Sequence, residues 1–372
     1  MRVSLTGCAS RQFFGKRWCT VPHPEALVTW NLNLALKHNM IKALFPSILI
    51  ALLAASGAQA QPAVPLRLMS VIALPEVHGR IDHFDADLDH QRLFMSALGN
   101  DTLQVFDLRA NKPIQTISGL SEPQGVTYVP KSNRIFVANG GDGTVRMFDG
   151  GTYKPLELVH FPSDADDTRY DSHTNRVFVG YGGEEDAALG ILDGATGQIV
   201  QRIKLPGHPE SFQLEASGHR IFVNVPTAGN KIAVISRSEG KVIAMWTLGG
   251  AQDNFPMALD EKDHRLFVTT RTPPEVFVLD TDSGKVIARV QSVGHADDMW
   301  YDAARKRIYV SGGSGFISVI QQEDAAHYRN MAQIRTVPGG RTSCFVPELN
   351  RLYLGVWGHG GQPDGLRVYE PQ

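Results

Sequence analysis

Charged and imidazole side chains recur in this sequence at two fixed distances before a repeated arginine. The repeated residues are Arg92, Arg134, Arg176, Arg220, Arg265, Arg307 and Arg351. Ten residues before them stand Asp82, Gln124, Asp166, Glu210, Phe255, Asp297 and Arg341. Twelve residues before them stand Arg80, Glu122, Asp164, His208, Asp253, His295 and Gly339. Guanidinium, carboxylate and imidazole groups gathered in one place could bind a small polar ligand through charge-assisted hydrogen bonds.

A divalent cation is a second ligand that these side chains could hold. Carboxylate and imidazole groups are common ligands of such ions. The candidate ligands are Asp166, His208, Glu210, His295 and Asp297. No pair among them has a tight metal-binding spacing such as His-Glu-x-x-His. One divalent cation is therefore the only cofactor that the sequence brings into consideration.

A third interpretation needs no ligand, because the charges could satisfy one another. If the repeats close into a ring, Arg341 of the last repeat lies next to Asp82 of the first and next to Asp297 on its other side. Opposite charges at short range favour the ionised forms of both partners. The sequence leaves ligand binding, metal binding and mutual ion pairing open.

Each repeated arginine begins a phrase of Arg, an aliphatic residue and an aromatic residue, as in Arg134-Ile135-Phe136. Successive arginines are 42 to 45 residues apart. Short apolar runs at this period, separated by Gly, Asp and Asn, are typical of a propeller with four-stranded antiparallel blades. The sequence therefore predicts an all-β, seven-bladed β-propeller.

The second repeat shows the strands expected in each blade. We expect an inner strand over 123–128, a second over 134–138, a third over 144–149 and an outer strand over 156–160. Because side chains alternate along a strand, the two polar rows should point the same way, toward the mouth of the central channel. The same register nearer the arginine is mostly apolar, as at Ala86 and Tyr128. We therefore expect a charged funnel above an apolar interior.

The last repeat has no outer strand of its own, because its third strand ends two residues before Gln372. Residues 66–74 precede the first inner strand and have a strand pattern. Pairing of this segment with residues 366–369 would complete the last blade and remove free sheet edges. We therefore expect the ring to be closed by the N-terminal strand.

The strand phrases also resemble a known repeat. Phe136-Val-Ala-Asn139 followed by Gly143-Thr-Val-Arg-Met-Phe-Asp149, Phe267-Val-Thr-Thr270 and Tyr309-Val-Ser-Gly312 resemble the YVTN repeat of YncE-like seven-bladed propellers. The resemblance covers residues 66–370. It implies the fold and no particular activity, because the repeat motif is structural. It also adds single-stranded nucleic acid to the ligands to be considered.

Residues 40–60 are predicted to be a Sec-type signal peptide. They begin with Met40 and one lysine, continue with an apolar run over 43–55 and end in Ala58-Gln59-Ala60, a small-x-small cleavage site. We expect residues 1–39 to reflect a gene start assigned too early, or else a long leader. Residues 61–372 should form one propeller domain, periplasmic or secreted. No segment is apolar for long enough to predict a membrane span.

Charge and cysteine content narrow the partners further. Residues 1–60 hold 6 of the 36 Lys and Arg and 1 of the 38 Asp and Glu, so the rest carry 30 against 37, a net charge of −7. Nucleic acid or an anionic membrane would require a basic face, so we expect neither as a partner. Cys344 is the one cysteine after residue 60, and no internal disulfide is expected.

These observations favour a monomeric binding or scaffolding module that holds a small polar ligand or a protein partner at the channel mouth. The expected site residues are Arg80, Asp82, Glu122, Asp166, His208, Glu210, His295, Asp297 and Arg341. One alternative is a metal-dependent lyase or lactonase-like enzyme that uses the same mouth, and another is binding of single-stranded nucleic acid. No catalytic motif supports an enzyme, so binding is the favoured function.

Overall fold

The computed structural model describes residues 64–358 and 364–372. The predicted leader and signal peptide, residues 1–60, lie outside these residues. The described strands form seven four-stranded sheets, and neighbouring strands within each sheet run antiparallel. No helix in this part of the chain is long and apolar enough to cross a membrane.

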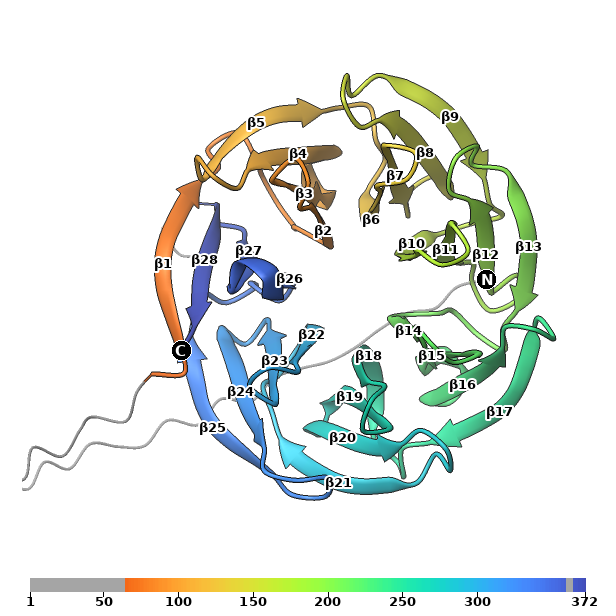
Figure 1. The fold of residues 1–372 in the computed structure, drawn as a ribbon, viewed down its shortest axis with the longest axis vertical. Helices are drawn as coiled ribbons and strands as arrows, with labels where there is room; N and C mark the ends of the chain where they lie inside the picture. Colours follow the sequence, from red (N-terminus) through yellow and green to blue (C-terminus); the bar gives the residue numbers. More distant parts are fainter. Residues whose placement is uncertain (1–63, 359–363) are drawn as a thin grey trace, which may run out of the picture. The chain divides into compact units, whose positions relative to one another are not determined.

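The sheets are the blades of a ring, each with one strand at the centre (Figure 1). The inner strands are β2 (Phe84–Asp87), β6 (Pro123–Val129), β10 (Ala165–Asp171), β14 (Phe212–Leu214), β18 (Gln252–Asp260), β22 (Ala296–Asp302) and β26 (Ser343–Val346). We number the blades 1 to 7 in this order. The prediction of a seven-bladed propeller with four-stranded antiparallel blades is confirmed.

Every second strand begins at one of the repeated arginines. These strands are β3 (Arg92–Ala97), β7 (Arg134–Asn139), β11 (Arg176–Tyr181), β15 (Arg220–Val225), β19 (Arg265–Thr272), β23 (Arg307–Gly312) and β27 (Arg351–Val356). The third strands are β4 (Thr102–Asp107), β8 (Thr144–Asp149), β12 (Ala188–Asp193), β16 (Lys231–Ser236), β20 (Pro274–Asp280), β24 (Phe316–Gln322) and β28 (Gly365–Pro371). In blade 2 the predicted strand ends differ from the observed ends by at most one residue.

The outer strands include one from the opposite end of the chain. They are β5 (Lys112–Ile117), β9 (Pro155–His160), β13 (Ile199–Lys204), β17 (Lys241–Thr247), β21 (Val286–Gln291), β25 (Tyr328–Arg335) and, in blade 7, β1 (Leu66–Ala73). β1 pairs antiparallel with β28, from Leu66 opposite Pro371 to Ala73 opposite Gly365. The predicted closure by the N-terminal strand is confirmed.

The repeated Arg-aliphatic-aromatic phrase has a structural role. Its aromatic residue packs between blades, as the fully buried Phe136 does. In all repeats but one, its arginine forms an ion pair with an acid at the end of the third strand, as Arg134 does with Asp149 at 2.9 Å, or with an acid before the second strand, as Arg220 does with Glu215 at 2.6 Å. Arg307 instead donates a hydrogen bond to Gln321. The repeat therefore builds the blades and leaves the chemistry to other positions.

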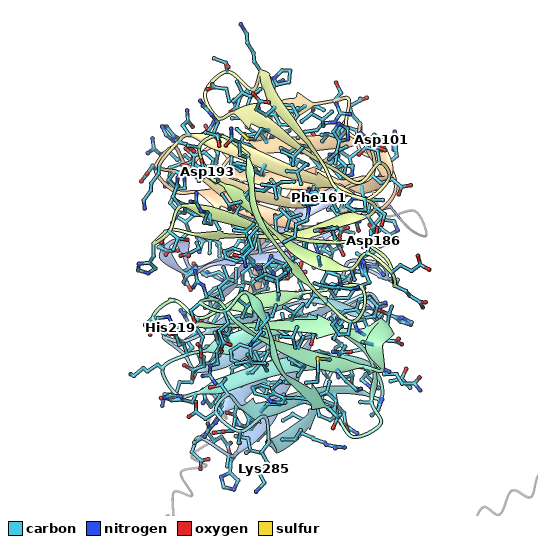
Figure 2. All side chains as sticks on the ribbon, turned by 90° about the vertical axis from the view of Figure 1, so that its right-hand side faces the viewer. Asp101, Phe161, Asp186, Asp193, His219 and Lys285 are labelled. Carbon is cyan, nitrogen blue, oxygen red and sulfur yellow. The ribbon has the colours of Figure 1, made fainter. Side chains whose placement is uncertain are left out.

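The two faces of the ring carry different connections. Figure 2 shows Asp101 and Asp186 on one face and Asp193 and His219 on the opposite face. Asp101 and Asp186 lie between second and third strands, whereas Asp193 ends a third strand and His219 precedes a second strand. We call the first the loop face and the second the turn face.

Candidate functional site

A cluster of charged side chains occupies the loop-face end of the central channel. It contains Arg80, Asp82, Asp166, His208, Glu210, Arg271, Asp297 and Arg341, from every blade except blade 2. Its position on the loop face follows from His208, whose Nδ1 donates a hydrogen bond to the carbonyl of Gly182 at 2.6 Å, in the loop that carries Asp186. We call these eight residues the mouth cluster.

Three guanidinium groups converge on the carboxylate of Asp297, which is only 8% exposed. Arg271 donates a hydrogen bond from Nη2 to Oδ1 at 2.6 Å. Nε of Arg341 lies 2.6 Å from Oδ2, and Nη2 of Arg80 lies 3.7 Å from the same oxygen. The three arginines come from three different blades, so this one carboxylate ties blades 1, 5 and 7 to blade 6.

Asp82 is the fully buried member of the cluster and pairs with Arg80. Nη2 of Arg80 donates to Oδ1 of Asp82 at 3.2 Å. Burial raises the pKa of Asp82 to about 6, although the nearby charges of His83 and Arg80 oppose the shift. Arg341 was expected to lie next to both Asp82 and Asp297. In the structure Arg341 pairs with Asp297, and Asp82 pairs with Arg80.

His208 and Asp166 form a further ion pair of the cluster, with Nε2 of His208 3.6 Å from Oδ2 of Asp166. Burial alone would lower the pKa of His208, but the interaction with Asp166 outweighs it and raises that pKa to about 9. Burial and the charge of Asp166 raise the pKa of Glu210 well above its ordinary value. At neutral pH the cluster therefore offers the protonated imidazole of His208 as a hydrogen-bond donor.

The raised pKa of His208 predicts how stability depends on pH. Folding raises this pKa from 6.5 to about 9, so the stabilisation is fully present below pH 6.5 and is lost as the pH rises through 9. We expect the free energy of unfolding, measured with urea at a series of pH values, to fall over this interval. His208→Gln should abolish that part of the decline.

His219→Gln is the matched control, because His219 is exposed and lies on the turn face, away from the mouth cluster. It should keep the decline of the unmodified protein. Asp82 contributes to the pH dependence of stability below this pH interval, since its pKa moves from 3.8 to about 6 on folding. An equal decline in the His208→Gln variant would show that another group titrates there.

A second layer of charge lies deeper in the channel, where an apolar interior was expected. Nδ1 of His83, just before β2 of blade 1, lies 3.3 Å from Oδ1 of Asp298 in blade 6. Blade 7 stands between these two blades in the ring. Arg169 contacts Asp167. Burial alone would lower the pKa of His83, but the charges of Asp298 and Asp82 hold it well above the ordinary value. The prediction of an apolar interior in that register was wrong.

A β-bulge in the inner strands explains the error. Asp166 and Asp167 together face one residue of β11, because Ala165 pairs with Tyr181 and the next pair is Thr168 with Val179. Equivalent irregularities occur in β6, β18 and β22. An extra residue shifts the alternation by one. The charged side chains below the mouth therefore stand nine and seven residues before the arginines, while Tyr128, six residues before Arg134, packs between blades 1 and 2 and borders the channel.

Two expected site residues lie apart from the cluster. In the described ranges, no ion pair or side-chain hydrogen bond joins Glu122 or His295 to its members. Both residues have left-handed backbone, with φ of 47° and 56°. Strand alternation does not apply to such a residue, so the twelve-residue row does not point one way. Arg80 and His208 of that row are not left-handed, and these two reach the cluster.

Sequence reasoning did not place Arg271 or His83 among the site residues. Six residues after the repeated arginines stand Leu98, Gly140, Gly182, Pro226, Arg271, Gly313 and Trp357. Arg271 is the single charged residue of that row, which was a usable signal. His83 had no such signal, because its direction depends on the bulge.

The geometry also bears on the candidate metal ligands. Within residues 64–358 and 364–372, no three His, Cys, Asp or Glu side chains form a group that could hold a metal ion. Of the five candidates, His208 and Asp166 pair with each other, and Asp297 is engaged by arginines. The divalent cation stays a prediction from the sequence.

The fold and this cluster define a seven-bladed β-propeller with a charged channel mouth. The chain is distantly similar to YncE proteins over 46% of its length. It is 27% identical over 184 residues to the uncharacterized protein YncE of Salmonella typhi and 26% identical over 184 residues to that of Salmonella typhimurium. The match covers 48% of each relative, so the chain spans about half the length of the curated relatives it matches. No family model matches the chain.

A solved structure shares the architecture. A chain of hydrazine synthase from Kuenenia stuttgartiensis superimposes with a TM-score of 0.66 at 14% identity, covering 81% of this chain and 96% of that one. An identity this low shows the fold alone. The comparisons thus confirm the predicted YncE-like resemblance and the propeller, and they assign no ligand.

Proposed function

We propose that the protein is an exported binding module whose mouth cluster holds a small polar ligand with an anionic group. The observation that carries the proposal is the convergence of Arg271, Arg341 and Arg80 on Asp297. Two carboxylates, Asp297 and Asp82, are the ion-pair partners of these three guanidinium groups among the described residues. Each guanidinium has five donors, and a carboxylate or phosphate is the partner that matches their geometry.

Unsatisfied buried atoms support the proposal. Nε of Arg80 and Oδ2 of Asp167 are buried and have no hydrogen-bond partner among the described residues. Buried polar atoms normally have a partner, and an ordered water or a ligand can supply it. The protonated imidazole of His208 is a further donor at the same mouth. The acidic group of a ligand can accept hydrogen bonds from Nε of Arg80 and from His208, and a hydroxyl of the same ligand can donate to Oδ2 of Asp167.

The export part of the proposal rests on the sequence of residues 40–60, and the ligand part rests on the geometry. The similarity to YncE proteins covers about half the length of those proteins, and their names state no ligand. The comparison therefore does not identify a ligand for this chain. A protein partner would need to present an acidic group to the mouth cluster, because guanidinium groups are the ligand-binding groups of this site.

The test is calorimetric titration of the purified protein with succinate, citrate and inorganic phosphate at neutral pH and low salt. We expect at least one of these anions to bind. Arg80→Gln and Arg341→Gln should each weaken that binding about tenfold or more, because each removes a charge-assisted contact. Melting curves followed by circular dichroism establish that the variants are folded.

Arg109→Gln is the matched control, since Arg109 is exposed in the turn between β4 and β5 of blade 1. It should bind the anion as the unmodified protein does. Absence of binding with all three anions, or equal affinity in the Arg80→Gln variant, would contradict the proposal and favour mutual ion pairing as the role of the cluster.

A further inference from the structure

A cavity of about 400 Å³ lies in the same channel, toward the turn face. It is lined by Phe84, Asp85, Ala86, Val126, Thr127, Tyr128, Pro130, Thr168, Arg169, Tyr170, Gln213 and Trp300. Tyr170 shows which end of the channel this is, because its hydroxyl donates to Asn175 in the turn that precedes β11. The carbonyl of Asn175 in turn accepts from Gly194, beside Asp193 of the turn face (Figure 2).

The wall of the cavity is polar on one side and apolar on the other. Seven residues before the repeated arginines stand Asp85, Thr127, Arg169, Gln213, Ala258, Trp300 and Cys344. Blades 1 to 4 thus supply a carboxylate, a hydroxyl, a guanidinium and an amide. From the other side of the ring, blade 6 supplies the indole of Trp300, whereas Ala258 and Cys344 do not line the cavity. A ligand that fits both sides has a polar end and an apolar end.

The polar groups are held in place by other parts of the protein. Asp85 accepts hydrogen bonds from the backbone N–H of Ala86 at 2.8 Å and of Tyr128 at 2.7 Å. Arg169 donates from Nη1 to the carbonyl of Thr168 at 2.8 Å and lies over the ring of Phe212. Groups held in this way lose little freedom when a ligand binds.

The apolar side is held as well. The indole Nε1–H of Trp300 donates to the carbonyl of Ser343 at 3.0 Å, which fixes the ring against blade 7. The only polar atom of this side chain is thereby satisfied by the protein. The ring itself remains for an apolar contact with whatever enters the cavity.

Asp85 and Arg169 border this cavity without pairing with each other. Among the described side chains, no ion pair joins them, although they are opposite in charge. Burial raises the pKa of Asp85 to about 6, so the carboxyl is mainly ionised at neutral pH. Asp85 uses two of the about four hydrogen bonds that an ionised carboxylate accepts. Arg169 already pairs with Asp167 and donates to Thr168 through Nη1, and other N–H groups of its guanidinium are available to a ligand.

We propose that this cavity is a second binding site, independent of the mouth cluster, for a free amino acid with an apolar side chain. The ammonium group of the ligand contacts Asp85, its carboxylate contacts Arg169, and its side chain packs on Trp300. A zwitterion matches a cavity in which an ionised carboxylate and a guanidinium lie on the same side. The volume lies in the range of small-molecule sites, about 300–1,000 Å³.

The test is calorimetric titration of the purified protein with L-phenylalanine, L-leucine and glycine. We expect the two apolar amino acids to bind more tightly than glycine. Asp85→Asn should weaken phenylalanine binding about tenfold or more, because the charge-assisted contact to the ammonium is lost. Trp300→Leu should weaken phenylalanine binding severalfold through loss of the aromatic contact.

Asp89→Asn is the matched control, because Asp89 is exposed just beyond β2 and does not line the cavity. It should bind phenylalanine as the unmodified protein does. Failure of both apolar amino acids to bind, or unchanged affinity in a folded Asp85→Asn variant, would overturn the proposal. The two sites are distinguishable, because Arg80→Gln acts on succinate binding and Asp85→Asn acts on phenylalanine binding.

Discussion

Replacing Asp297 by alanine is expected to lower the free energy of unfolding by about 3–5 kcal/mol. The substitution removes the carboxylate on which Arg271, Arg341 and Arg80 converge. It leaves Arg271 and Arg341 in a largely buried place without their paired counter-charge, and it leaves Arg80 with Asp82 alone. Leaving one partner of a buried ion pair unpaired costs more than the pair itself contributes. Urea denaturation at neutral pH measures the loss.

Asp282→Ala is the control for this prediction. Asp282 also pairs with an arginine, Arg220 at 3.3 Å, but its side chain is 64% exposed. Solvent screens such a pair, and its loss should cost about 0–1 kcal/mol. A similar small loss for Asp297→Ala would mean that water or other carboxylates already neutralise the three arginines. Partial recovery of the Asp297→Ala variant on addition of succinate would support an anion site at the mouth.

The closing strand gives the second large effect. Leu66 and Ile72 stand near the two ends of β1, and both are buried, in separate clusters that join blade 7 to blades 6 and 1. Truncating a buried Leu or Ile to alanine typically costs about 2–5 kcal/mol. We expect losses of this size for Leu66→Ala and for Ile72→Ala, measured by urea denaturation.

Val71→Ala is the control, because Val71 lies beside Ile72 in the same strand but is 52% exposed. It should change the free energy of unfolding by about 0.5 kcal/mol or less. If all three variants lost equally little, β1 would not contribute packing to the ring. Its pairing with β28 would then be the whole of its contribution.

The fold was predictable from the sequence because each blade repeats the same requirements. The Arg-aliphatic-aromatic phrase marks the start of every second strand, and the alternation around it marks the neighbouring strands. Closure by residues 66–73 followed from a missing outer strand at one end and an unassigned strand at the other. Both features are properties of the residue pattern along the chain, so they could be predicted without the structure.

The site was predictable only in part. Asp82, Asp166, Glu210, Asp297 and Arg341 were found because one position before the bulge faces the channel in every blade. No residue pattern marks the bulge in the sequence. His83 and Asp298 were therefore not predicted as site residues, and the channel interior was wrongly predicted to be apolar. Left-handed turns removed Glu122 and His295 for a similar reason. Local backbone geometry, not residue type, decided these positions.

The pairing of β1 with β28 also constrains the order in which the molecule can be completed. Arg67 and Glu370 are joined by an ion pair across 303 residues of chain. Contacts between such distant segments close a long loop and form slowly. The six blades built from contiguous chain can form as synthesis proceeds, whereas the seventh must wait for the final residues. An incomplete chain would expose strand edges, which makes the last step of assembly the most vulnerable to association with other molecules.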